Sequence, residues 1–276
     1  MIGFAPAKIN LGLFVTDKRP DGFHDLESVF CPIPWNDVLE VHLREEPGLL
    51  LKLSGIPIPG KPEENLLVKA YEMVHQTHEI GGVDAHLLKA IPMGAGLGGG
   101  SSDAVCMIKL LNELFELQLS KEDGMKMAER LGSDCPFFWN AQPAYVRGRG
   151  EHIQELPNNP LSGSTILIIH PNIHIATKLA FQNIVPQAPP TDWLEFTSAP
   201  INRWGQWLRN DFQSGMTHAH ESLAQCVQHL EQYGASYVQM TGTGSACFGL
   251  FENESLAQMA QTQIQNDNWI SFIRQM

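Results

Sequence analysis

The strongest local signal in the sequence is a glycine-rich segment, Pro92-Met93-Gly94-Ala95-Gly96-Leu97-Gly98-Gly99-Gly100-Ser101-Ser102-Asp103. It lies between an expected strand, Val83–Ala90, and a helix expected from about Ser102 to Phe115. Glycines let backbone N–H groups converge on an anion without obstruction by Cβ, and a helix N-terminus adds a favourable field. The hydroxyls of Ser101 and Ser102 can bond a phosphate oxygen or a magnesium-bound water. A flexible turn is the simplest alternative, but this density of glycines followed by two serines and a helix favours a phosphate-binding loop.

Two familiar phosphate loops do not fit this stretch. A Walker A loop needs a lysine before its Ser or Thr, and Gly100 occupies that place. Gly94, Gly96 and Gly99 do match the spacing of the dinucleotide fingerprint, which is a weak pattern when it stands alone. That fingerprint also requires a second strand closed by an acidic residue about twenty residues on, and here a helix is expected instead. The loop therefore favours a nucleotide site of another kind.

Composition narrows the class of partner. Thirty acidic against eighteen basic residues give a formal charge of −12, which argues against binding nucleic acid or an anionic membrane over a broad face. The N-terminus lacks the basic segment and apolar run of a signal peptide, and no apolar stretch is long enough to span a bilayer. The five cysteines form no close pairs. We expect a cytoplasmic protein with reduced thiols that acts on small molecules; the sequence does not indicate its oligomeric state.

Two polar residues share one face of the first expected strand, Ala7–Val15. Ile9, Leu11 and their alternate neighbours form the apolar face, while Lys8 and Asn10 lie on the other. This alternation predicts a half-buried strand that presents a cation and an amide side by side. An exposed strand lysine and a surface amide are the common alternatives. Asp134 lies in an apolar context, before Cys135-Pro136-Phe137-Phe138, where a lone carboxylate is costly unless it is paired. A structural cap or a salt-bridge partner is the alternative for Asp134.

The remaining pattern predicts an α+β chain with mixed or antiparallel sheets. Strands are expected near Leu26–Ile33, Val38–Arg44 and Leu49–Leu53, and helices begin at the caps Asn65 and Ser120. A turn is expected at Arg19–Gly22 and a surface loop at Pro186–Pro200, with helices around Trp204–Phe212 and His218–Tyr233. Asn158–Ser164 suggests a domain boundary, which divides the chain into residues 1–160, with the nucleotide loop, and 161–276.

Three motifs in order along the chain resemble those of the GHMP (galactose, homoserine, mevalonate, phosphomevalonate) kinase superfamily. They are Pro6-Ala7-Lys8-Ile9-Asn10-Leu11, the loop Pro92–Ser102, and Thr241-Gly242-Thr243-Gly244-Ser245-Ala246. Two further segments, Asp21-Gly22-Phe23-His24 and Gly132-Ser133-Asp134-Cys135-Pro136-Phe137-Phe138, resemble the branch that phosphorylates a cytidine diphosphate-linked polyol. The resemblance implies a two-domain GHMP-kinase-like fold with its active site between the domains.

The resemblance also implies roles. Asp134 would accept the proton of the substrate hydroxyl, and Lys8 would stabilise charge on the transferring phosphoryl group. ATP would bind the loop Pro92–Ser102, and Mg²⁺ would arrive with the nucleotide rather than in a dedicated protein cage. Asn10 would position the polyol, and Gly242 and Thr243 would shape the site beside its phosphates.

A cytosine clamp is the last expectation. By resemblance, Phe23 would stack on the base, in place of the usual tyrosine, with Phe181 covering the other face and His24 bonding the base edge. A core position in a helix around Ile175–Ile184 is the alternative for Phe181. The implied reaction is ATP-dependent phosphorylation of the 2-hydroxyl of a cytidine diphosphate-linked methylerythritol, in the non-mevalonate route to isoprenoids. Two rivals stay open: another superfamily member, such as a mevalonate or homoserine kinase, and a catalytically silent nucleotide-binding module.

Overall fold

The computed structural model describes residues 1–182, 184–266 and 268–276, which form two compact units. Unit 1 consists of residues 1–8, 32–93 and 98–142, and unit 2 of residues 9–31, 94–97 and 143–276. These units differ from the contiguous ranges 1–160 and 161–276, because strands β1 (Ile2–Lys18) and β2 (His24–Arg44) have residues in both. The division near residue 160 as a boundary between domains stays a prediction.

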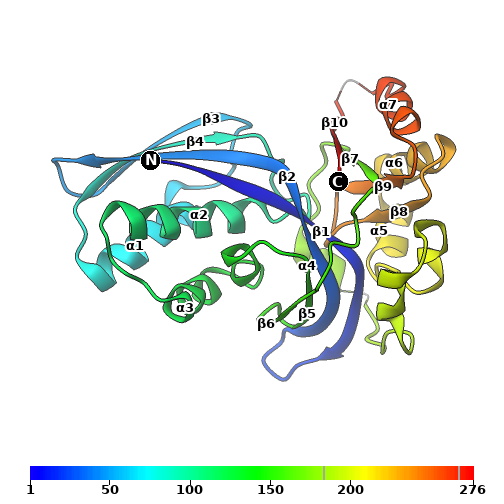
Figure 1. Ribbon diagram of the computed structural model, residues 1–276, viewed down its shortest axis with the longest axis horizontal. Coiled ribbons are helices and arrows are strands. Elements are labelled where there is room, and N and C mark those ends of the chain that lie inside the picture. Colours follow the sequence, from blue (N-terminus) through cyan, green and yellow to red (C-terminus); the bar gives the residue numbers. More distant parts are fainter. Residues whose placement is uncertain (183, 267) are drawn as a thin grey trace. The chain divides into compact units, whose positions relative to one another are not determined.

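Unit 1 places helices on a mixed sheet. Strand β4 pairs in parallel with β3 and antiparallel with residues 38–44 of β2. Figure 1 shows α1 and α2 side by side along this sheet. The remaining elements are β3 (Leu49–Gly55), β4 (Gly82–Lys89), α1 (Leu66–His78), α2 (Gly99–Leu114), α3 (Lys121–Leu131) and the 3₁₀ turns η1 (Pro62–Glu64) and η2 (Pro136–Trp139).

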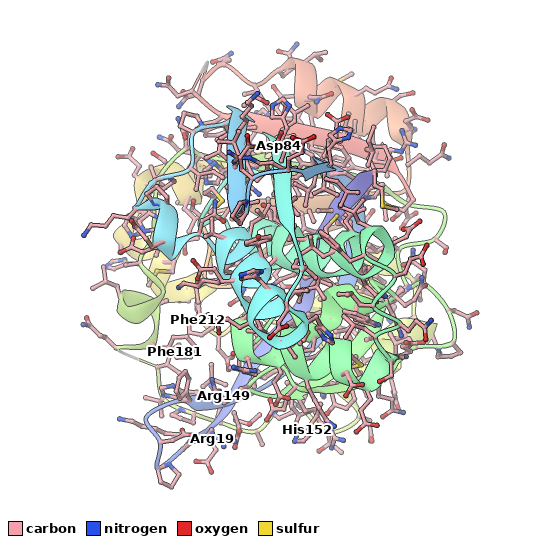
Figure 2. The ribbon with its side chains drawn as sticks, turned by 90° about the vertical axis from the view of Figure 1, so that its left-hand side faces the viewer. Arg19, Asp84, Arg149, His152, Phe181 and Phe212 are labelled. Carbon is pink, nitrogen blue, oxygen red and sulfur yellow. The ribbon has the colours of Figure 1, made fainter. Side chains whose placement is uncertain are left out.

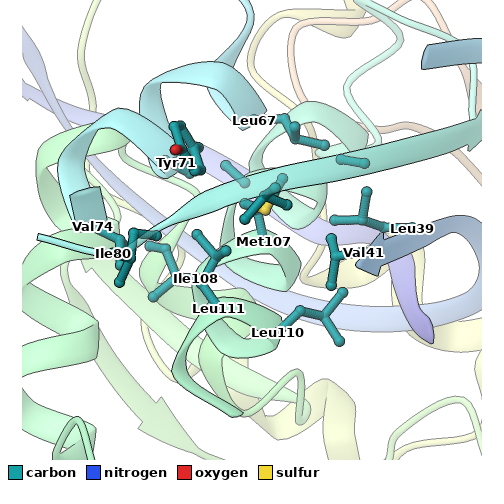
Figure 3. Packing of buried hydrophobic residues seen from close by; sticks show 14 of the residues in the cluster. Leu39, Val41, Leu67, Tyr71, Val74, Ile80, Met107, Ile108, Leu110 and Leu111 are labelled. Carbon is teal, nitrogen blue, oxygen red and sulfur yellow. The ribbon is translucent and has the colours of Figure 1, made fainter. Parts of the chain in front are cut away.

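The core of unit 1 follows from strand alternation. Leu39 and Val41 of β2, and Val83, Ala85 and Leu87 of β4, lie at every second position and are all buried. They pack against apolar side chains of α1 and α2, as Figure 3 shows. Each fully buried leucine or valine contributes about 1.5–3 kcal/mol, so this layer holds α2 against the sheet.

Unit 2 contains a four-stranded antiparallel sheet in the order β10-β7-β9-β8. Residues 26–30 of β2 also pair with β5, which pairs with β6. The apolar side chains of β7 and β9 meet those of α6 and α7 in a second core. The elements are β5 (Ala144–Gly148), β6 (His152–Glu155), β7 (Thr165–His170), α4 (Thr177–Phe181), η3 (Trp193–Ser198), η4 (Ile201–Gln206), α5 (Gln213–Ala219), α6 (Glu221–Gln232), β8 (Tyr237–Met240), β9 (Cys247–Phe251), α7 (Glu254–Thr262) and β10 (Ile270–Gln275).

Several local predictions are confirmed. The side chain of Asn65 accepts a bond from Leu67 N at the start of α1, and that of Ser120 accepts one from Asp123 N at the start of α3. The turn after β1 is closed by a bond from Gly22 N to Arg19 O. The mixed and antiparallel sheets confirm the α+β class.

Other local predictions are wrong for identifiable reasons. The two strands expected at Leu26–Ile33 and Val38–Arg44 are one strand. Pro32 and Pro34 do not interrupt it, because they lie between the stretch that pairs with β5 and the stretch that pairs with β4.

The second half of the chain departs from expectation in three places. The helix expected at Trp204–Phe212 is only the 3₁₀ turn η4, after which Asn210 forms a bridge with Leu13 of β1. The helix expected at His218–Tyr233 is split between α5 and α6, because His220 is extended, with φ −131° and ψ 101°. The expected surface loop Pro186–Pro200 contains η3, which buries Trp193 and Phe196. Within the described ranges, none of the helices is long and apolar enough to cross a membrane.

Candidate active site

The site residues expected from the sequence fall into three groups, each inside one unit. The first group, in unit 1, centres on Lys8 and Asp134. Lys8 Nζ lies 3.4 Å from Asp134 Oδ2. Lys8 is 3% exposed, so the expectation of an open polar face on β1 is wrong, whereas the Asp134 side chain is 35% exposed. A buried ammonium is costly without a counter-charge, and Asp134 supplies one while still facing solvent.

The start of α2 lies against Lys8. Gly98 precedes the first residue of α2 and has φ +70°, a backbone conformation that favours glycine. A Cβ built on Gly98 would lie 2.7 Å from Phe138 Cζ and 3.1 Å from Lys8 Cγ. Unit 1 therefore brings the glycine loop, the lysine of the first motif and the Asp134 segment together, although they are far apart in the sequence.

The side chain of Ser102 places an unpaired hydroxyl near this helix terminus. Its backbone N–H bonds Gly98 O at 3.0 Å, while its buried hydroxyl has no hydrogen-bond partner. Helix N-termini attract anions, and an orphaned hydroxyl is a suitable partner for a phosphate oxygen or a magnesium-bound water. No group of three or more His, Cys, Asp or Glu side chains that could hold a metal occurs among the residues the structure describes.

The second group, in unit 2, joins the rest of the glycine loop to the third motif. Thr241 is fully buried, and its hydroxyl lies 3.2 Å from Gly96 O. A Cβ on Gly96 would lie 2.1 Å from Thr241 O, and one on Gly242 would lie 2.9 Å from Gly96 Cα. Glycine is required at both positions, because the two loops touch backbone to backbone. Thr243 is half-buried.

Asn10 ties this contact to β1. Its Oδ1 accepts from Gly242 N at 3.0 Å, and its Nδ2 donates to the Ser28 hydroxyl at 3.0 Å. Its backbone N–H donates to the Thr241 hydroxyl at 3.1 Å. With 1% exposure, Asn10 is neither a surface amide nor on an open face of the strand. It holds the Gly242 loop in place, and its contact with substrate stays a prediction.

The third group is aromatic and also lies in unit 2. The rings of His24 and Phe181 are stacked, with centroids 4.8 Å apart and planes at 25°. Phe212 meets Phe181 edge-on at 4.8 Å, and Figure 2 shows these two phenylalanines as neighbours. A base does not fit between rings this close, so a base bound by Phe181 would contact another part of its ring.

Phe23 has a partner that the sequence did not indicate. It is 50% exposed, and the guanidinium carbon of Arg149 lies 3.8 Å from its ring centroid, at a distance typical of a cation–π contact. Arg149 also carries a buried Nε with no hydrogen-bond partner. Arg149 follows β5 in a short turn, and no motif marked it, because the contact depends on the pairing of β5 with β2.

Comparisons with known proteins agree with this arrangement. Residues 65–141 match the family described as GHMP kinases N terminal domain, and residues 199–270 match GHMP kinases C terminal. The chain is 43% identical to the 4-diphosphocytidyl-2-C-methyl-D-erythritol kinase of Bacteroides thetaiotaomicron, over 92% of this chain and 93% of that protein. It is 39% identical to the protein of the same name from Cytophaga hutchinsonii, over 92% and 93%.

Solved structures give the same result. A crystal structure of 4-(cytidine 5'-diphospho)-2C-methyl-D-erythritol kinase is similar with a TM-score of 0.79 and 28% identity, and the match covers 99% of this chain and 98% of that one. The mevalonate kinase of Methanococcus jannaschii matches with a TM-score of 0.71 at 15% identity, over 100% and 98% of the two chains, and this likeness concerns the fold alone.

Proposed function

The chain belongs to the 4-diphosphocytidyl-2-C-methyl-D-erythritol kinase family of the GHMP kinases, and from that membership we propose its reaction. It transfers the γ-phosphoryl group of ATP to the 2-hydroxyl of 4-diphosphocytidyl-2-C-methyl-D-erythritol, giving the 2-phosphate and ADP. This reaction belongs to the non-mevalonate route of isoprenoid biosynthesis. The observation that carries the proposal is the Lys8–Asp134 pair beside the glycine-capped start of α2.

Asp134 acts as the general base. Its carboxylate is partly exposed, so a substrate hydroxyl can reach it, and the attacking oxygen loses its proton to Asp134 as it bonds to the γ-phosphorus. Lys8 holds its ammonium 3.4 Å from the carboxylate and its aliphatic stem against Gly98. From there the ammonium offsets negative charge on the transferring group. Phosphoryl transfer depends mostly on positioning and charge neutralisation, and these residues supply both.

The loop Pro92–Ser102 binds the phosphates of ATP. Backbone N–H groups of the first turn of α2 face the anion, and the unpartnered Ser102 hydroxyl is available to it. We propose that Mg²⁺ accompanies the nucleotide, where it neutralises phosphate charge. The Ser102 hydroxyl, which has no hydrogen-bond partner, fits that group.

Phe23, His24 and Phe181 form the cytosine site in this proposal. Phe23 presents half of its surface to solvent, and the guanidinium of Arg149 lies over its ring. His24 lies next to Phe23 in the chain and stacks on Phe181. Gly242 and Thr243 complete the substrate site with Asn10, which holds their loop.

The test is ATP consumption by the purified protein with a panel of alcohols. We expect turnover with the diphosphocytidyl substrate and little with methylerythritol phosphate, mevalonate, homoserine or galactose, because these carry no base to stack. Faster turnover of mevalonate or homoserine would assign the chain to another activity of the same superfamily. No ATP turnover with any alcohol would indicate a silent nucleotide-binding module.

A further inference from the structure

Three charged side chains lie buried together in unit 1, outside the Lys8–Asp134 pair. Lys89 is the last residue of β4, Asp37 lies in β2, and Asp103 lies about one turn into α2. Each is at most 2% exposed. The ammonium of Lys89 donates to Asp37 Oδ2 and, at 2.8 Å, to Asp103 Oδ2. One cation therefore joins two carboxylates from different elements.

Asp37 also bonds the two residues that lead into the glycine loop. The chain leaves β4 at Lys89, and the next two backbone N–H groups, of Ala90 and Ile91, both donate to Asp37 Oδ1, at 2.6 and 2.8 Å. Asp37 thus accepts two backbone bonds with one oxygen and the lysine bond with the other. The Asp37 carboxylate therefore fixes the direction in which the chain leaves the sheet and enters the loop.

The same lysine reaches the other side of the loop. A Cβ built on Gly99, the first residue of α2, would lie 2.9 Å from Lys89 Nζ. The ammonium that bonds Asp103 therefore also lies against the first residue of α2. Its bonds connect the strand that leads into the loop with the helix that leads out of it.

We propose that Asp37, Lys89 and Asp103 form a positioning clamp that holds both ends of the loop Ala90–Gly98, so that the amides at the start of α2 keep their phosphate-binding geometry. This proposal rests on the nucleotide-binding role of the loop given above. None of the three side chains needs to touch ATP. They act through the backbone of Ala90 and Ile91 and through the position of α2.

Buried ion groups are often purely structural, and the two roles differ in what they predict. A structural ion group can be replaced by apolar side chains of similar size with little loss of stability, and sometimes with a gain. If the clamp only supports the fold, such a replacement leaves nucleotide binding unchanged. If it positions the loop, the replaced protein stays folded and binds ATP more weakly.

The decisive variant is Asp37→Asn/Lys89→Met/Asp103→Leu, which removes the link between the two ends of the loop and leaves no lone buried charge. The amide oxygen at position 37 can still accept from the N–H groups of Ala90 and Ile91. We expect a thermal midpoint close to that of the parent and a Michaelis constant for ATP raised about tenfold, with that for the alcohol substrate unchanged. Calorimetric titration with a non-hydrolysable ATP analogue should show an affinity for the analogue that is about tenfold weaker than in the parent. Asp103→Asn, whose amide oxygen still accepts from Lys89, should stay within about twofold of the parent.

The matched control is Lys126→Met/Glu122→Leu, which makes the corresponding lysine and carboxylate replacements at an exposed pair on α3. It should alter neither Michaelis constant. The parent must turn over ATP first, so failure of the proposed function is seen before any variant is compared. Parent-like ATP affinity in the folded triple variant overturns the clamp. If that variant does not fold, Asp103→Ala keeps the Lys89–Asp37 bond and carries the same expectation. The clamp is not a positioning device if Asp103→Ala lowers stability and raises both Michaelis constants to the same extent. Failure of both variants to fold overturns it as well.

Discussion

Replacing Gly98 by alanine tests the contact between the glycine loop and the Lys8 segment. At φ +70°, a residue with a Cβ costs about 1–2 kcal/mol. The new methyl would also lie 2.7 Å from Phe138 Cζ and 3.1 Å from Lys8 Cγ. Overpacking of this kind costs about 1–3 kcal/mol, and Phe138 is buried, so it has little room to move. The two costs together predict a loss of about 2–5 kcal/mol.

Gly100 provides a matched control in the same loop. It lies inside α2 without a positive φ, and the nearest atom to a built Cβ is Met93 Cε at 3.8 Å, an ordinary contact. Alanine there should be neutral or should stabilise the helix by up to about 1 kcal/mol. We expect scanning calorimetry to show Gly98→Ala melting about 5–10 °C below the parent and Gly100→Ala at or above it. Equal midpoints for the two variants would refute the close packing of Gly98 against Phe138 and Lys8.

Three further predictions concern chemistry, substrate and acid stability. Asp134→Asn and Lys8→Met should each lower kcat on the order of a hundredfold with little change in calorimetric affinity for an ATP analogue; turnover within threefold of the parent would remove that residue from the mechanism. Phe23→Ala and Phe181→Ala should raise the Michaelis constant for the cytidyl substrate about tenfold, since a stacked base is worth roughly 1–3 kcal/mol, while Phe23→Tyr should not; an unchanged constant in both alanine variants would exclude the clamp of aromatic rings. Burial lowers the pKa of His170 to about 4, so the folded protein keeps it neutral while the unfolded chain takes up a proton below about pH 6.5. Stability should therefore fall by about 3 kcal/mol as the pH drops from 7 to 4, and urea titrations of His170→Leu should lack this loss; an identical pH dependence in parent and variant would contradict it.

Local chemistry made part of the fold predictable. Asn65 and Ser120 start α1 and α3 because their side chains accept bonds from N–H groups that a helix leaves unpaired. Gly94, Gly96 and Gly98 could be placed in a loop before α2, and all three have a positive φ that most side chains cannot adopt. The helix itself begins at Gly99, three residues earlier than expected, so the end of the glycine-rich segment forms its first turn. These features depend on a few neighbouring residues, so the sequence states them directly.

The surroundings of the polar residues on β1 could not be predicted in this way. Alternation identifies the apolar face of a strand, but it does not reveal whether distant segments cover the other face. Asp134 covers Lys8 within unit 1, and the loop at Thr241 covers Asn10 within unit 2. Phe23 is a similar case, because its contact with Arg149 depends on strand pairing.

Lys89 shows that one buried charge did leave a signal in the sequence. Val83, Ala85, Leu87 and Lys89 alternate, so the parity that buries the first three also places the lysine on the apolar face. An ammonium there requires a carboxylate, and Asp37 has the same parity as Leu39 and Val41 in β2. Identifying Asp37 as the partner of Lys89 requires the pairing register of β2 and β4, because a shift of one residue would turn Asp37 to the opposite face. The structure gives that register, in which Val38 pairs with Leu88. The sequence gives no such signal for Lys8, because it lies on the face of β1 opposite the apolar residues Ile9 and Leu11. Lys8, the lysine of the proposed reaction, is therefore recognised only by its motif. The burial of Lys89, in contrast, can be predicted from the alternation of apolar residues along its strand.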